Sequence, residues 1–278
     1  MNNMKIITDS SSDVLTLDDI DFANAPLKII SDDRQFVDDE QLDVAEMVEY
    51  LEHYKGKTKS SCPNTNDWLE AFDDAKEIFC VTITSGLSGS YNSAFSAKQI
   101  YEDEYPDRKV FIIDSLSAGP ELRLIIEKLR EYILSGFSFE EICDKIEDYQ
   151  QNTGLIFMLK SLKNFANNGR VSPALAKIVG IVGICIVGKA SDEGTLEPLE
   201  KCRGEARAIK KITDFLAESG IEKGKVSISH CQNETGAIAL KKQIQDRFPS
   251  VQIDINECRG LCSFYAEKGG FLVGYEKF

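Results

Sequence analysis

Residues 85–91 have the sequence Ser-Gly-Leu-Ser-Gly-Ser-Tyr, a run of small and polar side chains that could bind an anion. The run follows the apolar stretch 78–83 and precedes a predicted helix, so it lies where a strand ends and a helix begins. At such a place glycines let a ligand approach the backbone, and the helix N-terminus offers free N–H donors and a positive dipole end. Ser85, Ser88 and Ser90 add hydroxyls. A carboxylate or phosphate site is one interpretation, and a plain turn that caps the helix is the other.

Three more segments of small polar residues lie in the first half of the chain, at 8–12, 58–62 and 114–118. The first and third follow predicted strands, and the second precedes a helix. Because the ends of parallel strands meet at one edge of a sheet, we expect these segments to surround a ligand crevice. Hydroxyl and amide donors without a neighbouring acid favour binding of a carboxylate or phosphate head group over catalysis. An apolar tail on that ligand would add about 0.8 kcal/mol for each buried methylene.

Strands and helices alternate along the part of the chain that carries these segments. Hydrophobic periodicity predicts strands at 5–7, 25–30, 78–83 and 110–113, with helices at 44–54, 66–75, 93–105 and 122–134 and one more from residue 138. Residues 57–64 are predicted as a polar loop. This alternation predicts a mainly parallel sheet covered by helices.

From residue 153 the pattern changes to one with more strands. Strands are predicted at 154–158, 181–187, 195–199, 226–230, 251–255 and 271–275, and helices at 159–167, 203–219 and 234–248. We therefore predict an α/β fold of two closely apposed domains, 1–152 and 153–278, with a mixed sheet in the second.

The composition narrows the range of partners. The 278 residues carry a formal net charge of −14, which disfavours nucleic acid and anionic membrane surfaces. The start of the chain lacks the features of a secretory signal, so we expect a cytoplasmic protein. The longest nearly apolar run, 178–188, is about half of the ~20 residues that a membrane helix needs, and we expect no membrane insertion. Length and apolar fraction suit a monomer.

Neither metal chemistry nor a common catalytic motif is indicated. The eight cysteines are scattered and only two histidines are present, so we expect no metal site and mostly buried thiols. Cys258 and Cys262 could pair on oxidation. Walker A, GxGxxG, GxSxG and HExxH patterns are absent from the sequence. A catalytic triad of a serine, His230 and either Asp9 or Asp114 remains an alternative.

Six segments, in the same order along the chain, resemble the DegV family of bacterial fatty acid-binding proteins. Residues 7–13 resemble its TDSsaDl signature, and 84–91 its SSGLSGTY loop with Ser90 in place of threonine. Residues 60–63 are similar to its TSqP loop, with Ser60 for threonine and Cys62 for glutamine. The remaining matches are 114–118 with a DSxSaS-type loop, 162–172 with LkkGGRIS, and 197–204 with a KxRg passage.

This resemblance implies a two-domain α/β protein that buries a long-chain fatty acid. In the family, hydroxyls of the TSqP and SGLSGT loops hold the carboxylate, which corresponds here to Ser60, Ser61 and Ser88, with Ser85 and Gly89 nearby. Family members deliver the acid to a separate ATP-dependent kinase subunit that forms the acyl phosphate.

Arginines of two family segments are implicated in that partnership, and Arg170 and Arg203 occupy the matching positions. From the residues alone, Arg170 could instead be solvated after its Asn-Gly turn. Arg203, placed on an early helix turn, could pair with Glu200 or Glu205.

The C-terminal segment departs from the family pattern. A histidine beside the ligand carboxylate is replaced by Tyr265, whose phenol donates a hydrogen bond but carries no positive charge at neutral pH. Glu267 would repel a carboxylate if it faced the site. Alternatively the segment faces solvent, with Tyr265 packed on the core.

The sequence therefore predicts a lipid-binding protein and not an enzyme, with a fatty acid as its ligand and no other cofactor. An enzyme acting on a small carboxylate or phosphate at the same loops, with His230 or Asp9 for acid–base work, is one alternative. A regulatory homologue that has lost lipid binding is another.

Overall fold

The computed structural model describes residues 4–172, 175 and 183–278 of the chain. Its first sheet has the strand order β2-β1-β6-β7, and every pair of neighbours is parallel. These strands are β1 (Met4–Asp9), β2 (Asp21–Ala25), β6 (Glu77–Thr82) and β7 (Lys109–Asp114). The prediction of a parallel sheet in the first half of the chain is confirmed.

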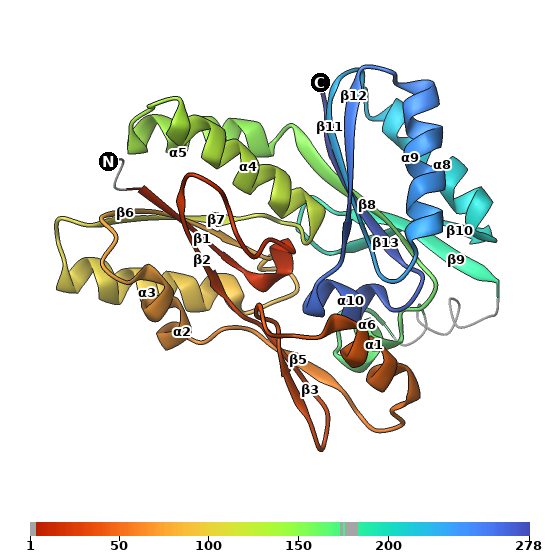
Figure 1. Ribbon diagram of the computed structural model, residues 1–278, viewed down its shortest axis with the longest axis horizontal. Coiled ribbons are helices and arrows are strands. Elements are labelled where there is room, and N and C mark those ends of the chain that lie inside the picture. Colours follow the sequence, from red (N-terminus) through yellow and green to blue (C-terminus); the bar gives the residue numbers. More distant parts are fainter. Residues whose placement is uncertain (1–3, 173–174, 176–182) are drawn as a thin grey trace.

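Helices cover both faces of this sheet (Figure 1). On one face, α2 (Thr65–Phe72) and α3 (Ser90–Glu104) bury Trp68 and Phe72 among the side chains of β1 and β6. On the other face pack α4 (Pro120–Leu134) and α5 (Phe139–Gln150). Burial on both faces explains the almost uninterrupted apolar sequence of β6.

A second, small sheet has the order β4-β3-β5 and is antiparallel. It consists of β3 (Lys28–Ile30), β4 (Gln35–Val37) and β5 (Lys59–Ser61), with α1 (Val44–His53) between β4 and β5. The single strand predicted at 25–30 is therefore wrong: the chain leaves the parallel sheet at Ala25 and enters the small sheet at Lys28. Pro26 lies between the two and lacks the N–H that a continuous strand would use. The loop predicted at 57–64 likewise contains β5.

The third sheet is mixed, with the order β10-β9-β8-β13-β11-β12. Only β11 and β12 pair in parallel among its described neighbours. Its strands are β8 (Thr153–Leu159), β9 (Ile184–Ala190), β10 (Leu196–Arg203), β11 (Gly224–His230), β12 (Val251–Glu257) and β13 (Phe271–Glu276). The predicted mixed sheet is confirmed; residues 181–182 of one predicted strand lie outside the described residues.

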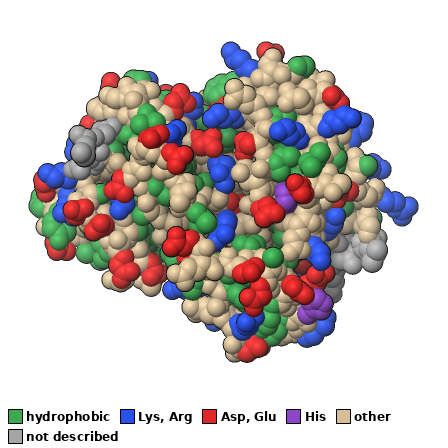
Figure 2. Space-filling view, viewed as in Figure 1, with side chains coloured by type: hydrophobic (Ala, Val, Ile, Leu, Met, Phe, Trp, Pro, Cys, Tyr) green, Lys and Arg blue, Asp and Glu red, His purple; other side chains and the backbone are tan. Residues whose placement is uncertain are grey.

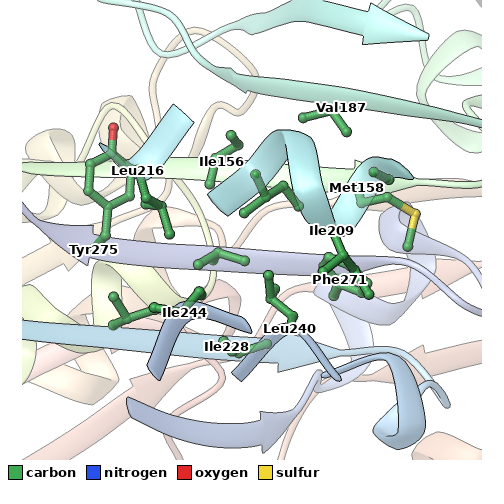
Figure 3. Close-up of a cluster of buried hydrophobic side chains, with 14 of the residues drawn as sticks. Ile156, Met158, Val187, Ile209, Leu216, Ile228, Leu240, Ile244, Phe271 and Tyr275 are labelled. Carbon is green, nitrogen blue, oxygen red and sulfur yellow. The ribbon is translucent and has the colours of Figure 1, made fainter. Parts of the chain in front are cut away.

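The two faces of the mixed sheet are buried against different partners. Ile156 and Met158 of β8 join a core under α8 (Glu205–Glu218) and α9 (Glu234–Arg247), shown in Figure 3. Leu155, Phe157 and Leu159 point the opposite way, toward α1 and α10 (Gly260–Ala266). This alternation brings one face of the second half of the chain against the first half.

Two helix predictions need correction, and one helix was missed. The helix predicted at 159–167 is shorter, because β8 continues to Leu159 and α6 spans Lys163–Asn167. The helix predicted from 203 begins at Glu205, after Gly204 with φ +84°. The short helix α10 was not predicted at all.

No helix in the described part of the chain has both the length and the apolar character needed to cross a membrane. On the face shown in Figure 2, acidic and basic side chains are interspersed among the other residues.

Candidate functional site

The polar segments that follow β1, β6 and β7 meet at one edge of the parallel sheet. The N–H of Ile83 donates to Asp9 Oδ2 at 2.9 Å, and the N–H of Thr84 donates to the carbonyl of Ser117 at 2.9 Å. The fourth segment arrives on β5 of the small sheet instead of on a strand of the parallel sheet. The segments after β6 and β7 and the segment on β5 contribute to one side of a cavity, whereas the segment after β1 is buried behind them and does not line it.

This cavity has a volume of about 310 Å³ and lies between the polar segments, α10 and the inner face of the mixed sheet. Most of its wall is apolar. The apolar lining residues are Leu27, Cys62, Ile83, Leu87, Ala118, Leu155, Phe157, Leu159, Phe165, Ala190, Leu196, Leu261, Cys262, Ala266 and Leu272. The others are Ser60, Ser61, Thr84, Ser88, Gly89, Ser117, Arg170, Gly194, Thr195 and Tyr265.

Ser60 and Tyr265 place two hydroxyl groups side by side in this cavity. The Ser60 Oγ and Tyr265 Oη atoms are 2.7 Å apart although 205 residues separate them in the sequence. Burial raises the pKa of the Tyr265 phenol, so it remains a neutral donor. Its ring packs on Phe165, with centroids 4.6 Å apart. The alternative in which this segment simply faces solvent does not describe the structure.

Arg170 is the one charged side chain among the described lining residues. It is half-buried, its Nε donates to the carbonyl of Leu87 at 3.1 Å, and its Nη1 donates to the carbonyl of Asn168. Arg170 is therefore not a freely solvated side chain after a turn. It brings a cation to a cavity whose other polar groups are neutral.

A carboxylate from the first half of the chain, Asp38, holds the start of α10. This helix carries Leu261, Cys262 and Tyr265 into the cavity wall. Asp38 accepts the N–H groups of Gly260 and Leu261, both at 2.8 Å. These are N–H groups of the first helical turn, which have no partner within the helix. Asp38 thus supplies a cap that the helix's own N-cap residue lacks.

The β9–β10 turn closes the cavity on the side of the parallel sheet. Gly194 has φ +70°, and a Cβ at this position would collide with Thr84 Oγ1. A larger residue would therefore push the turn away from the loop that follows β6.

The remaining predicted ligand residues are distributed unevenly. Ser60, Ser61, Ser88 and Gly89 line the cavity with Tyr265. Ser85 does not: it is exposed, and its N–H donates to Asp114 Oδ1 at 3.0 Å.

Arg203 lies outside the cavity lining, as the last residue of β10 and not on a helix turn. Its side chain is exposed and forms no hydrogen bond or ion pair with the described residues. The alternative pairings are wrong, because Glu200 pairs with Arg207 and Lys211, and Glu205 pairs with Lys160.

Glu267 does not face the cavity. Its Oε1 accepts the Ser161 hydroxyl at 2.8 Å and the N–H of Asn164 at 3.3 Å. Burial raises the pKa of this carboxyl, and the two donors oppose that rise. The repulsion considered for a bound carboxylate therefore does not arise from a lining residue.

The catalytic alternative finds no support in the geometry. His230 lies at the end of β11, and its Nδ1 atom contacts the N–H of Asn233 at 3.3 Å. Asp9 is occupied by the hydroxyls of Ser11 and Ser90 instead of a histidine. The described cavity lining contains neither a histidine nor a carboxylate to act as a general base.

No group of three metal-ligating side chains occurs among the described residues. Cys258 and Cys262 are buried free thiols in this structure. A second hollow of about 790 Å³ adjoins the first through Leu155 and Ala190, but acidic, basic and amide side chains mix around it. That mixture gives no preference for one class of ligand.

The residues of the apolar cavity wall were not predicted from the sequence. Leu155, Phe157 and Leu159 occupy every second position of β8, and Leu272 lies on β13 beside them. β8 is a continuous apolar run with no alternation between apolar and polar residues, so the sequence did not reveal which face lined a cavity. Asn168 was predicted only as part of the Asn-Gly turn that precedes Arg170, and this local pattern gave no sign of its contacts with β5.

Comparison with known proteins agrees with this geometry. A family model described as an uncharacterised protein of the DegV family matches residues 3–277. A DegV domain-containing protein of Streptococcus pneumoniae is 44% identical over 276 residues, which cover 98% of each chain.

Two solved structures superpose on almost the whole chain. One is the Streptococcus pneumoniae Fatty Acid Kinase (Fak) B3 protein loaded with linoleic acid, with a TM-score of 0.97, 44% identity and 99% of each chain covered. The other is a DegV family protein of Eubacterium eligens loaded with heptadecanoic acid, with a TM-score of 0.97, 42% identity and coverage of 99% of this chain and 100% of that one. The chain belongs to the DegV family.

Proposed function

We propose that this protein binds a long-chain fatty acid in the cavity between a domain of residues 1–152 and a domain of residues 153–278. The observation that carries the proposal is the chemistry of the described lining, which is mostly apolar and contains one charged side chain, Arg170. An apolar tail with a single negative head group is complementary to such a wall. The fatty acids in the two superposed relatives support this choice of ligand.

The carboxylate is proposed to bind at the hydroxyls of Ser60, Ser61, Ser88 and Tyr265 and the N–H of Gly89. Hydrogen bonds to a charged group contribute about 1.5–3 kcal/mol each, which orients the head group. Burial of the tail supplies the larger share, at about 0.8 kcal/mol per methylene. Ser85 belongs to the loop after β6, as do Ser88 and Gly89, but it is exposed and lies outside the cavity.

We further propose that the protein carries its ligand to a separate ATP-dependent fatty acid kinase subunit and performs no chemistry alone. Support comes from the relative identified as a Fatty Acid Kinase B3 protein. Arg170 at the cavity and Arg203 on the surface are the proposed contacts with that subunit. Arg203 suits this role because its guanidinium is exposed and has no partner among the described residues.

Ligand extraction from the purified protein tests the proposal. Organic extracts of the recombinant protein, analysed by mass spectrometry, are expected to contain long-chain fatty acid at near-stoichiometric amounts. Ser88→Leu places a branched side chain in the cavity and is expected to lower the recovered ligand at least about tenfold. The matched control is Ser96→Leu, because Ser96 is exposed on α3 and its hydroxyl bonds only to the carbonyl of Asn92.

Recovery of the acid from the wild type and from Ser96→Leu, with loss from Ser88→Leu, supports the proposal. A wild-type protein that neither retains nor binds added fatty acid would overturn it. Turnover of a small carboxylate or phosphate substrate by the purified protein alone would favour the enzyme alternative.

A further inference from the structure

Ser60 lies on an edge strand, and the free edge of that strand is occupied by one side chain from the second half of the chain. Within the part of the chain that the structure describes, β5 pairs with a strand, β3, on one side only. On its other side, the N–H of Ser60 donates to Asn168 Oδ1 at 3.2 Å, and Asn168 Nδ2 donates to the carbonyl of Thr58 at 3.3 Å. The side-chain amide of Asn168 therefore spans the backbone on both sides of Lys59.

This contact copies the pairing of a parallel strand. In a parallel ladder one residue donates its N–H to the residue before its partner and accepts the N–H of the residue after it. The Asn168 amide does the same to Thr58 and Ser60. β5 has only three residues and exposes unpaired N–H and C=O groups on its free edge, so these two hydrogen bonds add a second restraint on the backbone from which the Ser60 side chain projects.

The orientation of the amide is itself fixed. Asn168 Nδ2 also donates to the carbonyl of Asn164 at 2.8 Å, one turn earlier on α6. Both amide hydrogens and the amide oxygen thus have partners. Exchanging the oxygen and nitrogen would place an acceptor against two carbonyls and a donor against an N–H group.

Asn168 also contacts the cationic group of the cavity. Its main-chain carbonyl accepts Nη1 of Arg170. One residue therefore joins the strand that carries Ser60, the end of α6, and the guanidinium of Arg170. The Ser60 hydroxyl that it indirectly holds is 2.7 Å from the Tyr265 hydroxyl.

We propose that Asn168 is a positioning residue for the head-group end of the cavity: its amide holds β5 in place so that the Ser60 hydroxyl meets Tyr265 and the ligand carboxylate. The inference rests on the proposed fatty acid-binding function. In this role Asn168 affects recognition of the ligand carboxylate, although Asn168 itself does not contact the ligand tail.

The test compares a fatty acid with the primary alcohol of the same chain length. In Asn168→Ala, the affinity for the acid is expected to fall about five- to tenfold, while the affinity for the alcohol changes less than about twofold. The matched control is Asn152→Ala. Asn152 also follows a helix and donates its Nδ2 to the carbonyl four residues earlier, at Asp148, but it is exposed and forms no described hydrogen bond with the strand that carries Ser60.

A double-mutant cycle with Ser60→Ala separates positioning from a general structural effect. If Asn168 acts through Ser60, Asn168→Ala in the Ser60→Ala background is expected to weaken acid binding less than about twofold. Equal losses for acid and alcohol, or fully additive losses in the cycle, would overturn the inference.

Folding and function are controlled separately. Thermal unfolding of each variant is measured first. If Asn168→Ala does not fold, Asn168→Ser replaces it. Serine keeps a short polar side chain but cannot span Thr58 and Ser60. Wild-type protein that binds no fatty acid contradicts the proposed function. Wild type and Asn168→Ser that bind the acid equally contradict only the role of Asn168.

Discussion

Two serine-rich loops follow neighbouring strands of the parallel sheet, and they use their hydroxyls differently. In the loop after β1, Ser10, Ser11 and Ser12 are all buried. Ser11 Oγ donates to Asp9, Ser10 Oγ accepts the N–H of Leu27, and Ser12 Oγ accepts the N–H of Val14. Each hydroxyl is therefore engaged within the protein.

The loop after β6 divides its serines between the interior and the cavity. Ser90 is fully buried and donates to Asp9 at 2.6 Å, which links the two loops. Ser88 is half-buried and lines the cavity, and Ser85 is exposed. Two serine-rich loops thus serve stability in one case and a ligand in the other. The difference lies in which hydroxyls reach the cavity, because Ser88 accepts the N–H of Ser90 just as Ser12 accepts that of Val14, yet only Ser88 lines the cavity.

The contrast between the two loops can be tested by removing the Asp9 carboxylate, which accepts hydrogen bonds from both of them. Asp9 accepts the hydroxyls of Ser11 and Ser90 and the N–H groups of Ser11 and Ile83. Asp9→Ala leaves these buried donors without an acceptor and is expected to lower the free energy of unfolding by about 5 kcal/mol. Urea denaturation measures this change.

The control for that measurement is Asp246→Ala, because Asp246 is exposed and forms no ion pair with the described residues. It is expected to change stability by less than about 0.5 kcal/mol. An Asp9→Ala variant as stable as this control would show that the loop after β1 is not the structural one.

A second prediction concerns Asp13, which ends the same internal loop. Its Oδ1 accepts the N–H of Arg259 at 2.7 Å, and burial is the main cause that raises its pKa from 3.8 to about 7. Asp38 nearby raises this pKa further, and Arg123 lowers it. Because the folded protein holds this proton more tightly than the unfolded chain does, the contribution to stability is complete below about pH 4 and is lost as the pH rises through about 7.

Asp13→Asn removes this titration. Between pH 4 and pH 7 the wild type is expected to lose on the order of 4 kcal/mol more stability than the variant, from a shift of about three pKa units. Denaturation series at several pH values measure the difference, with Asp246→Asn as the control. Parallel curves for the wild type and Asp13→Asn would mean that Asp13 has an ordinary pKa. Asp9 and Glu121 also have pKa values raised by burial, but both proteins contain them, so their contributions cancel in the comparison. The pKa of Asp38 is also raised by burial, and because its charge acts on Asp13 the measured difference reports on this pair of carboxyls.

The sequence allowed β1, β6 and β7 to be predicted because their short apolar runs alternate with strongly periodic helices. The edge strand β2 was not predicted, because its residues are mostly half-exposed and form no apolar run. The sequence also did not allow β5 to be predicted, since the residues Lys-Ser-Ser have no hydrophobic pattern and the strand exists through its pairing with β3 and Asn168. The helix α10 was missed for a similar reason. Its first turn is capped by Asp38, more than 200 residues earlier in the chain, so no local motif marks its start.

The candidate site shows the same limit. The hydroxyl residues were predicted from loops after strands and from resemblance to a family, both of which depend on local sequence. The contact between Ser60 and Tyr265, the inward orientation of Arg170 and the exposure of Ser85 depend on how the two halves of the chain pack. Local sequence predicts which residues could bind a carboxylate, and packing decides which of them reach the cavity.

The smallest expected effect on ligand binding distinguishes Ser60 from Ser85. Ser60 lines the cavity and bonds to Tyr265, whereas Ser85 is exposed and contributes its N–H to Asp114. Ser60→Ala is expected to weaken fatty acid binding about five- to tenfold, and Ser85→Ala less than about twofold, because only the first change removes a hydroxyl from the cavity. Titration calorimetry with a fatty acid measures both, and thermal unfolding of each variant checks that the fold is intact. Equal losses of fatty acid affinity in the two variants would mean that the loop after β6 closes over the bound ligand and brings Ser85 to the carboxylate. The difference between cavity serines and surface serines would then hold only for the ligand-free protein.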